Sequence, residues 1–195
     1  MDKKILVLAS ANKGKIREIS DMLPEFKVVA YRELGENFDI EETGETFFDN
    51  ALIKAKAVSE KYDLPCLADD SGLCVEALSG APGVYSARYS ETGDDEDNND
   101  LLLNNMQGVK DRRAKFVCCA VFYMPNGEVF AETGETFGEI LNERQGKSGF
   151  GYDPVFYSFD LKKSFGLATE EEKNSVSHRS RAIHAISAVI KEKLK

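Results

Sequence analysis

The fold is decided by the stretch ILVLASANKGKIREISDMLPEFKVVAY, residues Ile5 to Tyr31. Its first residues, Ile5–Ala9, form a continuous apolar run, which is typical of a strand buried on both faces. The polar segment that follows leads into a helix predicted over Lys13–Leu23 and ended by Pro24, and a second strand is expected over Phe26–Tyr31. Short apolar runs that alternate with helical periods favour an α/β domain over a helical bundle or a β-sandwich.

The same alternation continues in the middle of the chain. A helix is predicted over Thr46–Tyr62, because apolar residues recur there at three- and four-residue intervals and leave Asn50 and Lys54 together on another face. A buried strand is expected over Leu64–Ala68, followed by a dense polar turn over residues 69–72. We expect the chemistry of the protein to lie at that turn.

The second half of the chain predicts a hairpin and a final helix. Long strands are expected over Ala114–Met124 and Glu128–Phe137, and the residues Pro125–Gly127 between them are a turn signal. Because the hairpin is antiparallel, the sheet should be mixed. A helix is predicted over Ser180–Leu194, with an apolar stripe that faces the core.

Length and composition indicate one ordinary globular domain. The 195 residues suffice for one sizeable core, so a single domain over residues 1–195 is expected. The chain has 42% hydrophobic and 30% charged residues, and it contains no apolar run long enough for a membrane span or a signal peptide. We therefore expect a cytoplasmic protein with no membrane partner. The four cysteines form no CxxC pair and are expected to be reduced and buried.

The charge of the chain restricts its partners. A net charge of -9 and a pI of about 4.9 argue against a protein that binds nucleic acid through a basic face. A small anionic substrate bound as a metal complex remains compatible with this charge. The densest acidic stretch, Asp94–Asp100, lacks the glycine of a calcium-binding EF-hand loop, and we interpret it as a solvated loop that caps the next helix.

Two groups of polar residues are candidates for a site. Ser10–Lys15 lies between a predicted strand and a predicted helix, where backbone amides, the helix dipole and Lys13 or Lys15 would favour a phosphate. Carboxylates gather at Glu41–Glu42 and at Asp69–Asp70, and such oxygen donors suit magnesium bridged to substrate phosphates. The alternative is that these carboxylates only cap helices.

Six segments then carry a resemblance that covers almost the whole chain. They are SANKGK (10–15), ETGETFFDNALIKA (42–55), ADDSGL (68–73), GAPGVYSARY (80–89), GFGYDPVF (149–156) and SHR (177–179). In these segments and in their order the chain resembles the non-canonical purine nucleoside triphosphate pyrophosphatases, the inosine triphosphatase-like enzymes. The resemblance implies an α/β fold whose mixed, curved central sheet and flanking helices form two lobes around a substrate cleft. It also implies a homodimer.

The resemblance further implies an activity and a set of residues. The activity is Mg²⁺-dependent hydrolysis of ITP, dITP and XTP to the monophosphate and pyrophosphate, which cleanses the nucleotide pool. Asp70 matches the proton acceptor, and Glu42 and Asp70 match magnesium-associated carboxylates. The matched substrate-binding positions are Ser10, Asn12, Lys15, Ser71, Phe150, Gly151, Tyr152, Asp153, Lys173, His178 and Arg179. Lys13 is a further substrate-binding candidate because it lies in the same polar segment as Lys15.

The chemistry can also be stated without the family. Hydrolysis between the α and β phosphates needs a proton acceptor for water and neutralisation of charge, for which Asp70, Glu42 and lysines are candidates. Whether Asp70 is a base, a metal ligand or both stays open. Two alternatives remain: a pyrophosphatase for modified pyrimidine nucleotides, against which Phe150–Asp153 and His178–Arg179 argue, and a non-catalytic nucleotide-binding module, against which Asp70 and Glu42 argue.

Overall fold

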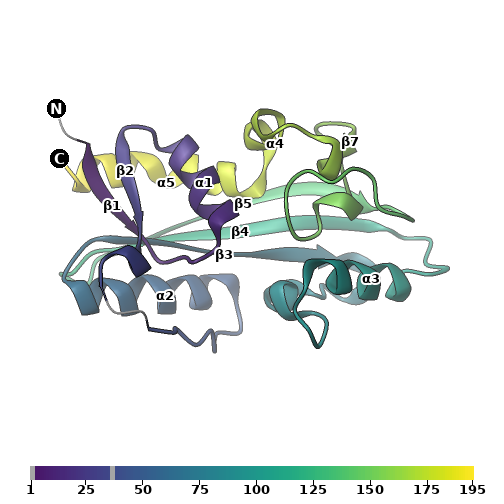
Figure 1. Ribbon diagram of the computed structural model, residues 1–195, viewed down its shortest axis with the longest axis horizontal. Helices are drawn as coiled ribbons and strands as arrows, with labels where there is room; N and C mark the ends of the chain where they lie inside the picture. Colours follow the sequence, from purple (N-terminus) through teal and green to yellow (C-terminus); the bar gives the residue numbers. More distant parts are fainter. Residues whose placement is uncertain (1–2, 36–37) are drawn as a thin grey trace. The chain divides into compact units, whose positions relative to one another are not determined.

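The computed structural model describes residues 3–35 and 38–195, and over these residues the strands form one mixed sheet (Figure 1). Strand β1 pairs in parallel with β2 and β3, whereas β6 pairs antiparallel with β5 and β7. This arrangement confirms the predicted mixed α/β class. The strand order is β2 (Phe26–Ala30), β1 (Lys4–Leu8), β3 (Cys66–Val75), β4 (Arg113–Tyr123), β5 (Val129–Ile140), β6 (Phe156–Ser158), β7 (Lys163–Ser164).

The chain divides into two compact units. The first contains the described residues up to Asp70 together with Cys118–Gly134 and Arg179–Lys195, and the second contains Ser71–Val117 and Glu135–His178. The expectation of one nucleotide pyrophosphatase domain over residues 1–195 stays a prediction. The helices are α1 (Lys13–Met22), α2 (Phe47–Tyr62), α3 (Asp95–Asn105), α4 (Glu170–Val176) and α5 (His178–Lys193). Among the described residues, no helix is both long and apolar enough to cross a membrane.

The first unit has a hydrophobic cluster on each face of its strands. Leu6 and Leu8 of β1 pack in a cluster with residues of α1 and α5, including Ile19 and Ile186. The alternate residues of the same strand, including Val7, pack with residues of α2 on the other face (Figure 1). Successive side chains of a strand point to opposite faces, so a continuous apolar run is the pattern that burial on both faces requires.

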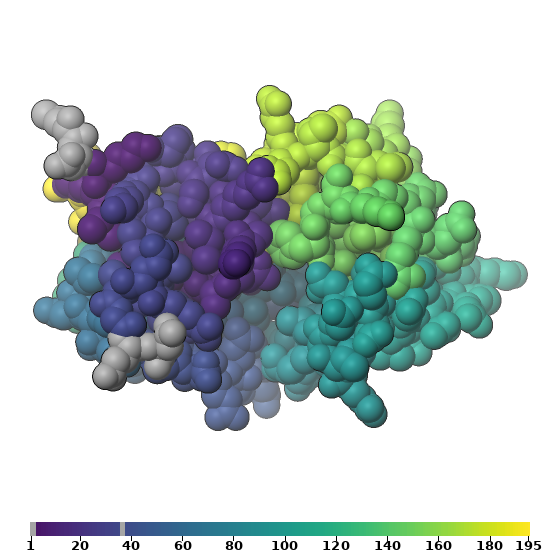
Figure 2. All heavy atoms as spheres, viewed as in Figure 1, coloured from purple at the N-terminus to yellow at the C-terminus, as the bar shows by residue number. Residues whose placement is uncertain are grey.

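The second unit has its own core. Leu73 and Phe116 pack there with Leu102 of α3 and with the aromatic residues Phe156 and Phe165. The side of this unit near α3 also includes the segment of residues 144–151, which lies against the helix (teal and green in Figure 2). Core packing therefore fixes α3 within the unit, and hydrogen bonds and an ion pair join residues 144–151 to this helix.

Several element boundaries follow the sequence closely. Helices α1 and α2 begin at Lys13 and Phe47, and the hairpin turn is closed by hydrogen bonds from Met124 N–H to the Glu128 carbonyl and from Gly127 N–H to the Met124 carbonyl. These elements confirm the predictions made for them. Helix α5 begins earlier than predicted, at His178.

Two predictions were wrong. The polar turn expected over residues 69–72 is the middle of β3, which runs on to Val75 because the apolar residues Leu73 and Val75 continue the strand into the second core. The solvated loop expected over Asp94–Asp100 is helix from Asp95 onward, although Asp94 caps α3 as predicted. Acidic residues in a first helical turn interact favourably with the helix dipole, and the prediction gave this effect too little weight.

Candidate active site

The start of α1 has the geometry expected for a phosphate cradle. Asn12 caps the helix, and its Oδ1 accepts a hydrogen bond from Lys15 N–H at 3.1 Å. Ser10 Oγ accepts from Asn12 N–H at 3.2 Å, which fixes the connection that leaves β1. The N–H groups of a first helical turn lack partners within the helix, so they and the helix dipole favour an anion here. Lys13 is exposed at the same turn.

Lys15 is held in place by a buried carboxylate. Its Nζ lies 3.0 Å from Asp69 Oδ2, and the same oxygen is 3.2 Å from Arg179 Nε. Arg179 also pairs through Nη1 with Glu18 of α1, and its side chain is only 1% exposed. Sequence reasoning did not identify Glu18 or the role of Asp69, because their partner lies at the start of α5.

The environment of Asp69 keeps it ionised. Burial alone would raise the pKa of this carboxyl, but the positive charges of Lys15, Arg179 and Lys54 hold the pKa well below its ordinary value. Cys118 donates its thiol to Asp69 Oδ2 across 3.8 Å, and burial raises the pKa of that thiol. Asp69 is therefore a fixed negative charge between two cations.

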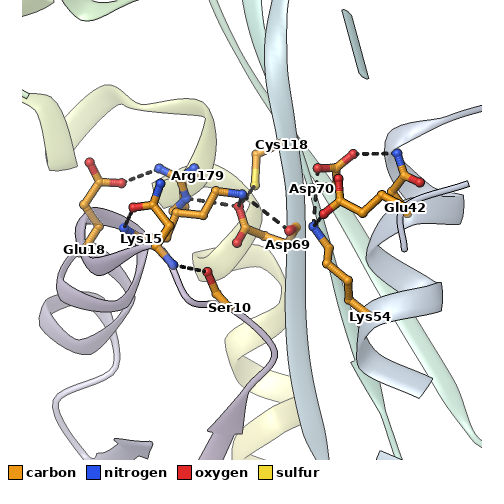
Figure 3. Close-up of polar contacts among 11 residues, drawn as sticks. Ser10, Lys15, Glu18, Glu42, Lys54, Asp69, Asp70, Cys118 and Arg179 are labelled. Carbon is orange, nitrogen blue, oxygen red and sulfur yellow. Dashed lines mark hydrogen bonds and ion pairs between the residues drawn. The ribbon is translucent and has the colours of Figure 1, made fainter. Parts of the chain in front are cut away.

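Asp70 lies on the opposite face of β3 (Figure 3). Its Oδ2 accepts a hydrogen bond from Asn50 Nδ2 at 3.2 Å, and its Oδ1 is 3.4 Å from Lys54 Nζ. Lys54 also forms an ion pair of 2.7 Å with Glu42 Oε1. Asn50 and Lys54 lie one turn apart on α2, which is the shared face that the sequence predicted. Their contact with Asp70 was not predicted.

Burial leaves the Asp70 carboxylate more basic than that of an ordinary aspartate, despite the cations near it. Burial raises its pKa and the charge of Glu42 adds to this effect, whereas Lys54 and Lys15 lower the pKa; the balance is a raised value. Burial lowers the pKa of Lys54. The negative charges of Asp70, Asp69 and Glu42 outweigh this effect, so the pKa of Lys54 is raised. A buried carboxylate with a raised pKa is well suited to accept a proton.

The carboxylates expected to bind magnesium fit a hard cation. Glu42 and Asp70 both contact the same Lys54 ammonium, so one oxygen of each carboxylate lies close to a common point. Mg²⁺ is usually bound by one or two carboxylates together with water and substrate phosphates. No group of three or more histidine, cysteine, aspartate or glutamate side chains suited to a metal occurs in the part of the chain that the structure describes.

Several of the predicted substrate-binding residues gather in the second unit. Asp153 is buried, and its Oδ2 accepts hydrogen bonds from Lys173 Nζ at 2.7 Å and from Phe150 N–H at 2.9 Å. Lys173 Nζ also lies 4.4 Å from the centroid of the Phe150 ring, a cation–π distance. The structure thus brings Phe150, Asp153 and Lys173 together.

The remaining predicted residues of this unit differ in their surroundings. Tyr152 is buried in the core and donates its hydroxyl to the Ser86 carbonyl at 2.8 Å. The His178 ring is buried and stacks on Phe116, with centroids 4.8 Å apart. Ser71 is half-buried in β3. Phe150, unlike Tyr152, lies outside the core cluster of the second unit.

Comparison with known proteins shows the family. A model of the Ham1 family matches residues 6–189 of the chain. The chain belongs to the Ham1 family. Within this family it is 44% identical over 190 residues to the dITP/XTP pyrophosphatase of Treponema denticola, a match that covers 95% of this chain and 98% of that protein.

Two further relatives agree with this assignment. The dITP/XTP pyrophosphatase of Staphylococcus epidermidis is 46% identical over 179 residues, covering 91% of this chain and 92% of that protein. The solved structure of the Staphylococcus aureus Ham1 protein is similar with a TM-score of 0.88 and 42% identity, and the match covers 97% of this chain and 100% of that one. The resemblance expected from the six sequence segments is therefore confirmed.

Proposed function

We propose that this chain is a Mg²⁺-dependent pyrophosphatase that converts dITP, ITP and XTP to the monophosphate and pyrophosphate. The observation that carries the proposal is the buried Asp70, whose raised pKa and contacts with Asn50 and Lys54 suit a proton acceptor. Relatives named dITP/XTP pyrophosphatase, similar along almost the whole chain, support the substrate class.

Asp70 accepts the proton of the attacking water in this mechanism. Burial makes the carboxylate a stronger base, and the Lys54 ammonium keeps enough of it ionised to act. Asn50 donates to the other carboxylate oxygen and so fixes the rotation of the group. A base that cannot rotate keeps its free lone pairs in one direction, which lowers the entropic cost of the reaction.

The phosphates of the substrate bind at the start of α1. Ser10, Asn12, Lys13 and Lys15 supply the contacts, and the amides of the first turn add donors. Asp69 holds the Lys15 ammonium at a fixed place, so its charge is in position before the substrate arrives.

We assign the magnesium ion to Glu42 and Asp70. When bound, it would neutralise phosphate charge and polarise the phosphorus–oxygen bonds. The Glu42–Lys54 ion pair supports this assignment, because it keeps the Glu42 carboxylate near Asp70.

Base recognition is assigned to residues of the second unit and of the start of α5. A six-oxo purine offers an acceptor where adenine offers a donor, so a donor such as His178 would favour it. The Phe150 ring is the candidate for stacking on the base. The other proposed contacts are Ser71, Gly151, Tyr152, Asp153, Lys173 and Arg179.

The cellular setting and the oligomeric state are further parts of the proposal. We propose that the enzyme acts in the cytoplasm as a homodimer and removes deaminated purine nucleotides before a polymerase can use them. Size-exclusion chromatography with light scattering tests the homodimer, and a monomer at micromolar concentration would overturn it.

The central test is product analysis of the purified chain. With Mg²⁺, dITP and XTP should give pyrophosphate, whereas dATP and dGTP should give little product, and EDTA should abolish turnover. Asp70→Asn should abolish turnover yet still bind dITP. The matched control is Asp63→Asn, since Asp63 is exposed in a left-handed conformation that asparagine tolerates.

Each contrary result removes a specific part of the proposal. Orthophosphate as the first product would refute cleavage at the α phosphate. Full turnover by Asp70→Asn would refute its role as the base, and hydrolysis of modified pyrimidine nucleotides alone would favour the pyrimidine-directed alternative.

A further inference from the structure

The acidic first turns of α3 contact the segment that contains Phe150. The carboxylate of Asp95 accepts a hydrogen bond from Gly151 N–H at 2.7 Å, and Asn99 Nδ2 donates to the Gly151 carbonyl at 3.0 Å. Asp95 and Asn99 lie four residues apart and therefore project from the same face of the helix. One helix thus holds both the N–H and the carbonyl group of a single glycine.

Arg144 joins the start of the same segment to α3. Its Nε is 3.1 Å from Glu96 Oε2, its Nη1 is 2.8 Å from Asp100 Oδ1, and its Nη2 donates to the Glu96 carbonyl at 2.8 Å. Both carboxylates are largely exposed, so these ion pairs contribute little stability by themselves. Their geometry nevertheless shows that the acidic stretch faces residues 144–151.

The segment needs such anchors because glycines flank its aromatic residue. Gly149 and Gly151 have φ values of +78° and +59°, which favour glycine over other residues. Glycine loses more conformational freedom than any other residue when it is ordered. Phe150 therefore sits between two intrinsically flexible points, and its direction depends on what fixes them.

The C-terminal side of the segment has separate anchors. Asp153 accepts from Phe150 N–H and pairs with Lys173, and Tyr152 is buried in the core. Asp95 adds a charge-assisted hydrogen bond to the next peptide group, and such bonds are shorter and stronger than neutral ones. Phe150 is thus held by one carboxylate at its own amide and by another at the amide of Gly151.

We propose that Asp95 and Asn99 are positioning residues that orient Phe150 for binding of the purine base. The proposal rests on the proposed function, in which the Phe150 segment recognises the base. It gives the acidic stretch Asp94–Asp100 a specific role, because an oxygen of the Asp95 carboxylate accepts the hydrogen bond that holds the Gly151 amide of the base-binding segment in place. Asp95 itself touches neither the base nor the reacting phosphates.

The test compares Asp95→Ala with Asp95→Asn and Asp97→Ala. Asp95→Ala removes the acceptor, whereas Asp95→Asn keeps an oxygen that can accept from Gly151 N–H. The matched control is Asp97→Ala, which removes an equal charge from the same helical turn. It should leave the Phe150 segment in place, because the carboxylate of Asp97 contacts Thr92 instead. For each protein, KM and kcat for dITP are measured, together with the inhibition constant of inorganic tripolyphosphate, which carries phosphates without a base.

The expected result separates base binding from phosphate binding. Asp95→Ala should raise KM for dITP about tenfold, with a smaller change in kcat and an unchanged inhibition constant for tripolyphosphate. Asp95→Asn should restore most of the affinity, and Asp97→Ala should behave like the unchanged chain. If Asp95→Ala does not fold, Asn99→Ala provides the same test, because its side chain holds the carbonyl of the same glycine.

Other results would overturn the inference. An unchanged KM for Asp95→Ala, an equal loss in Asp97→Ala, or an equal loss of dITP and tripolyphosphate affinity would each exclude a positioning role toward the base. An unchanged chain that does not hydrolyse dITP would instead overturn the proposed function, so the two failures are distinguishable.

Discussion

Replacement of Asp69 by asparagine tests whether the ion pairs of the buried Asp69 carboxylate stabilise the protein. The Asp69 carboxylate is completely buried and accepts from Lys15 at 3.0 Å and from Arg179 at 3.2 Å. Asparagine keeps the shape and one acceptor oxygen but removes the negative charge. Lys15 and Arg179 would then lose the carboxylate that both contact, while Glu18 would still pair with Arg179.

The size of the effect follows from these contacts. Two charge-assisted hydrogen bonds contribute about 1.5–3 kcal/mol each, or about 3–6 kcal/mol together. Breaking a buried ion pair by removing one partner costs about 3–5 kcal/mol, which lies in the same range. For a chain of this length, each kcal/mol lowers Tm by about 2–4 °C, so Asp69→Asn should lower Tm by about 6–20 °C.

The assay is thermal unfolding followed by circular dichroism from pH 7 down to pH 2. The pKa of Asp69 is lowered in the folded chain, so its contribution to stability is fully present above its ordinary pKa of 3.8 and is lost as the pH falls below that value. Asp69→Asn should therefore be less stable at pH 7 and should show a shallower loss of stability in acid.

A double variant checks the assignment to Arg179. If Asp69 and Arg179 stabilise each other, adding Arg179→Met to Asp69→Asn should cost much less than the sum of the two single changes. Additive effects, or a fall in Tm of less than about 2 °C for Asp69→Asn, would refute the reasoning.

Two further predictions concern the other carboxylates. Lys54→Met should shift the acidic limb of the kcat–pH profile to higher pH, because the Lys54 charge lowers the pKa of Asp70 and its loss requires a higher pH for the base to ionise; an unmoved limb would contradict Asp70 as the base. Gly149→Ala should lower Tm more than Gly80→Ala, measured by the same unfolding assay. Both glycines have positive φ, but a Cβ on Gly149 would lie 1.9 Å from the Asp153 carboxylate whereas a Cβ on Gly80 would meet nothing within 4 Å; equal effects would exclude this crowding.

Elements whose apolar residues recur at a regular spacing could be predicted from the sequence. The apolar run of β1 and the three- and four-residue spacing of α2 report directly on the faces that are buried. Helix α4 was not predicted, although Thr169 and Glu172 form a capping box whose spacing is visible in the sequence. The sequence therefore contains a local signal for the start of this helix.

The polar site was harder to predict because its partners are distant in sequence. Asp69 and Asp70 resemble a turn when only their neighbours are considered, and Asp69 is stable within a strand because Arg179, 110 residues away, pairs with it. Likewise, the acidic start of α3 contacts Gly151, 56 residues from Asp95. Sequence patterns gave the residue types of the candidate site, while these contacts depend on the packing of whole elements.

Asp69 and Asp70 are adjacent in β3, so the number of residues before them in the strand decides which cations each carboxylate contacts. Because neighbouring strand residues point to opposite faces, removal of one residue between Leu67 and Asp69 would send each carboxylate toward the cations of the other. The protein should therefore tolerate changes of side-chain size in this stretch far better than changes of length. Insertions and deletions in variants of this chain should be absent from β3 and should collect in the connections around it.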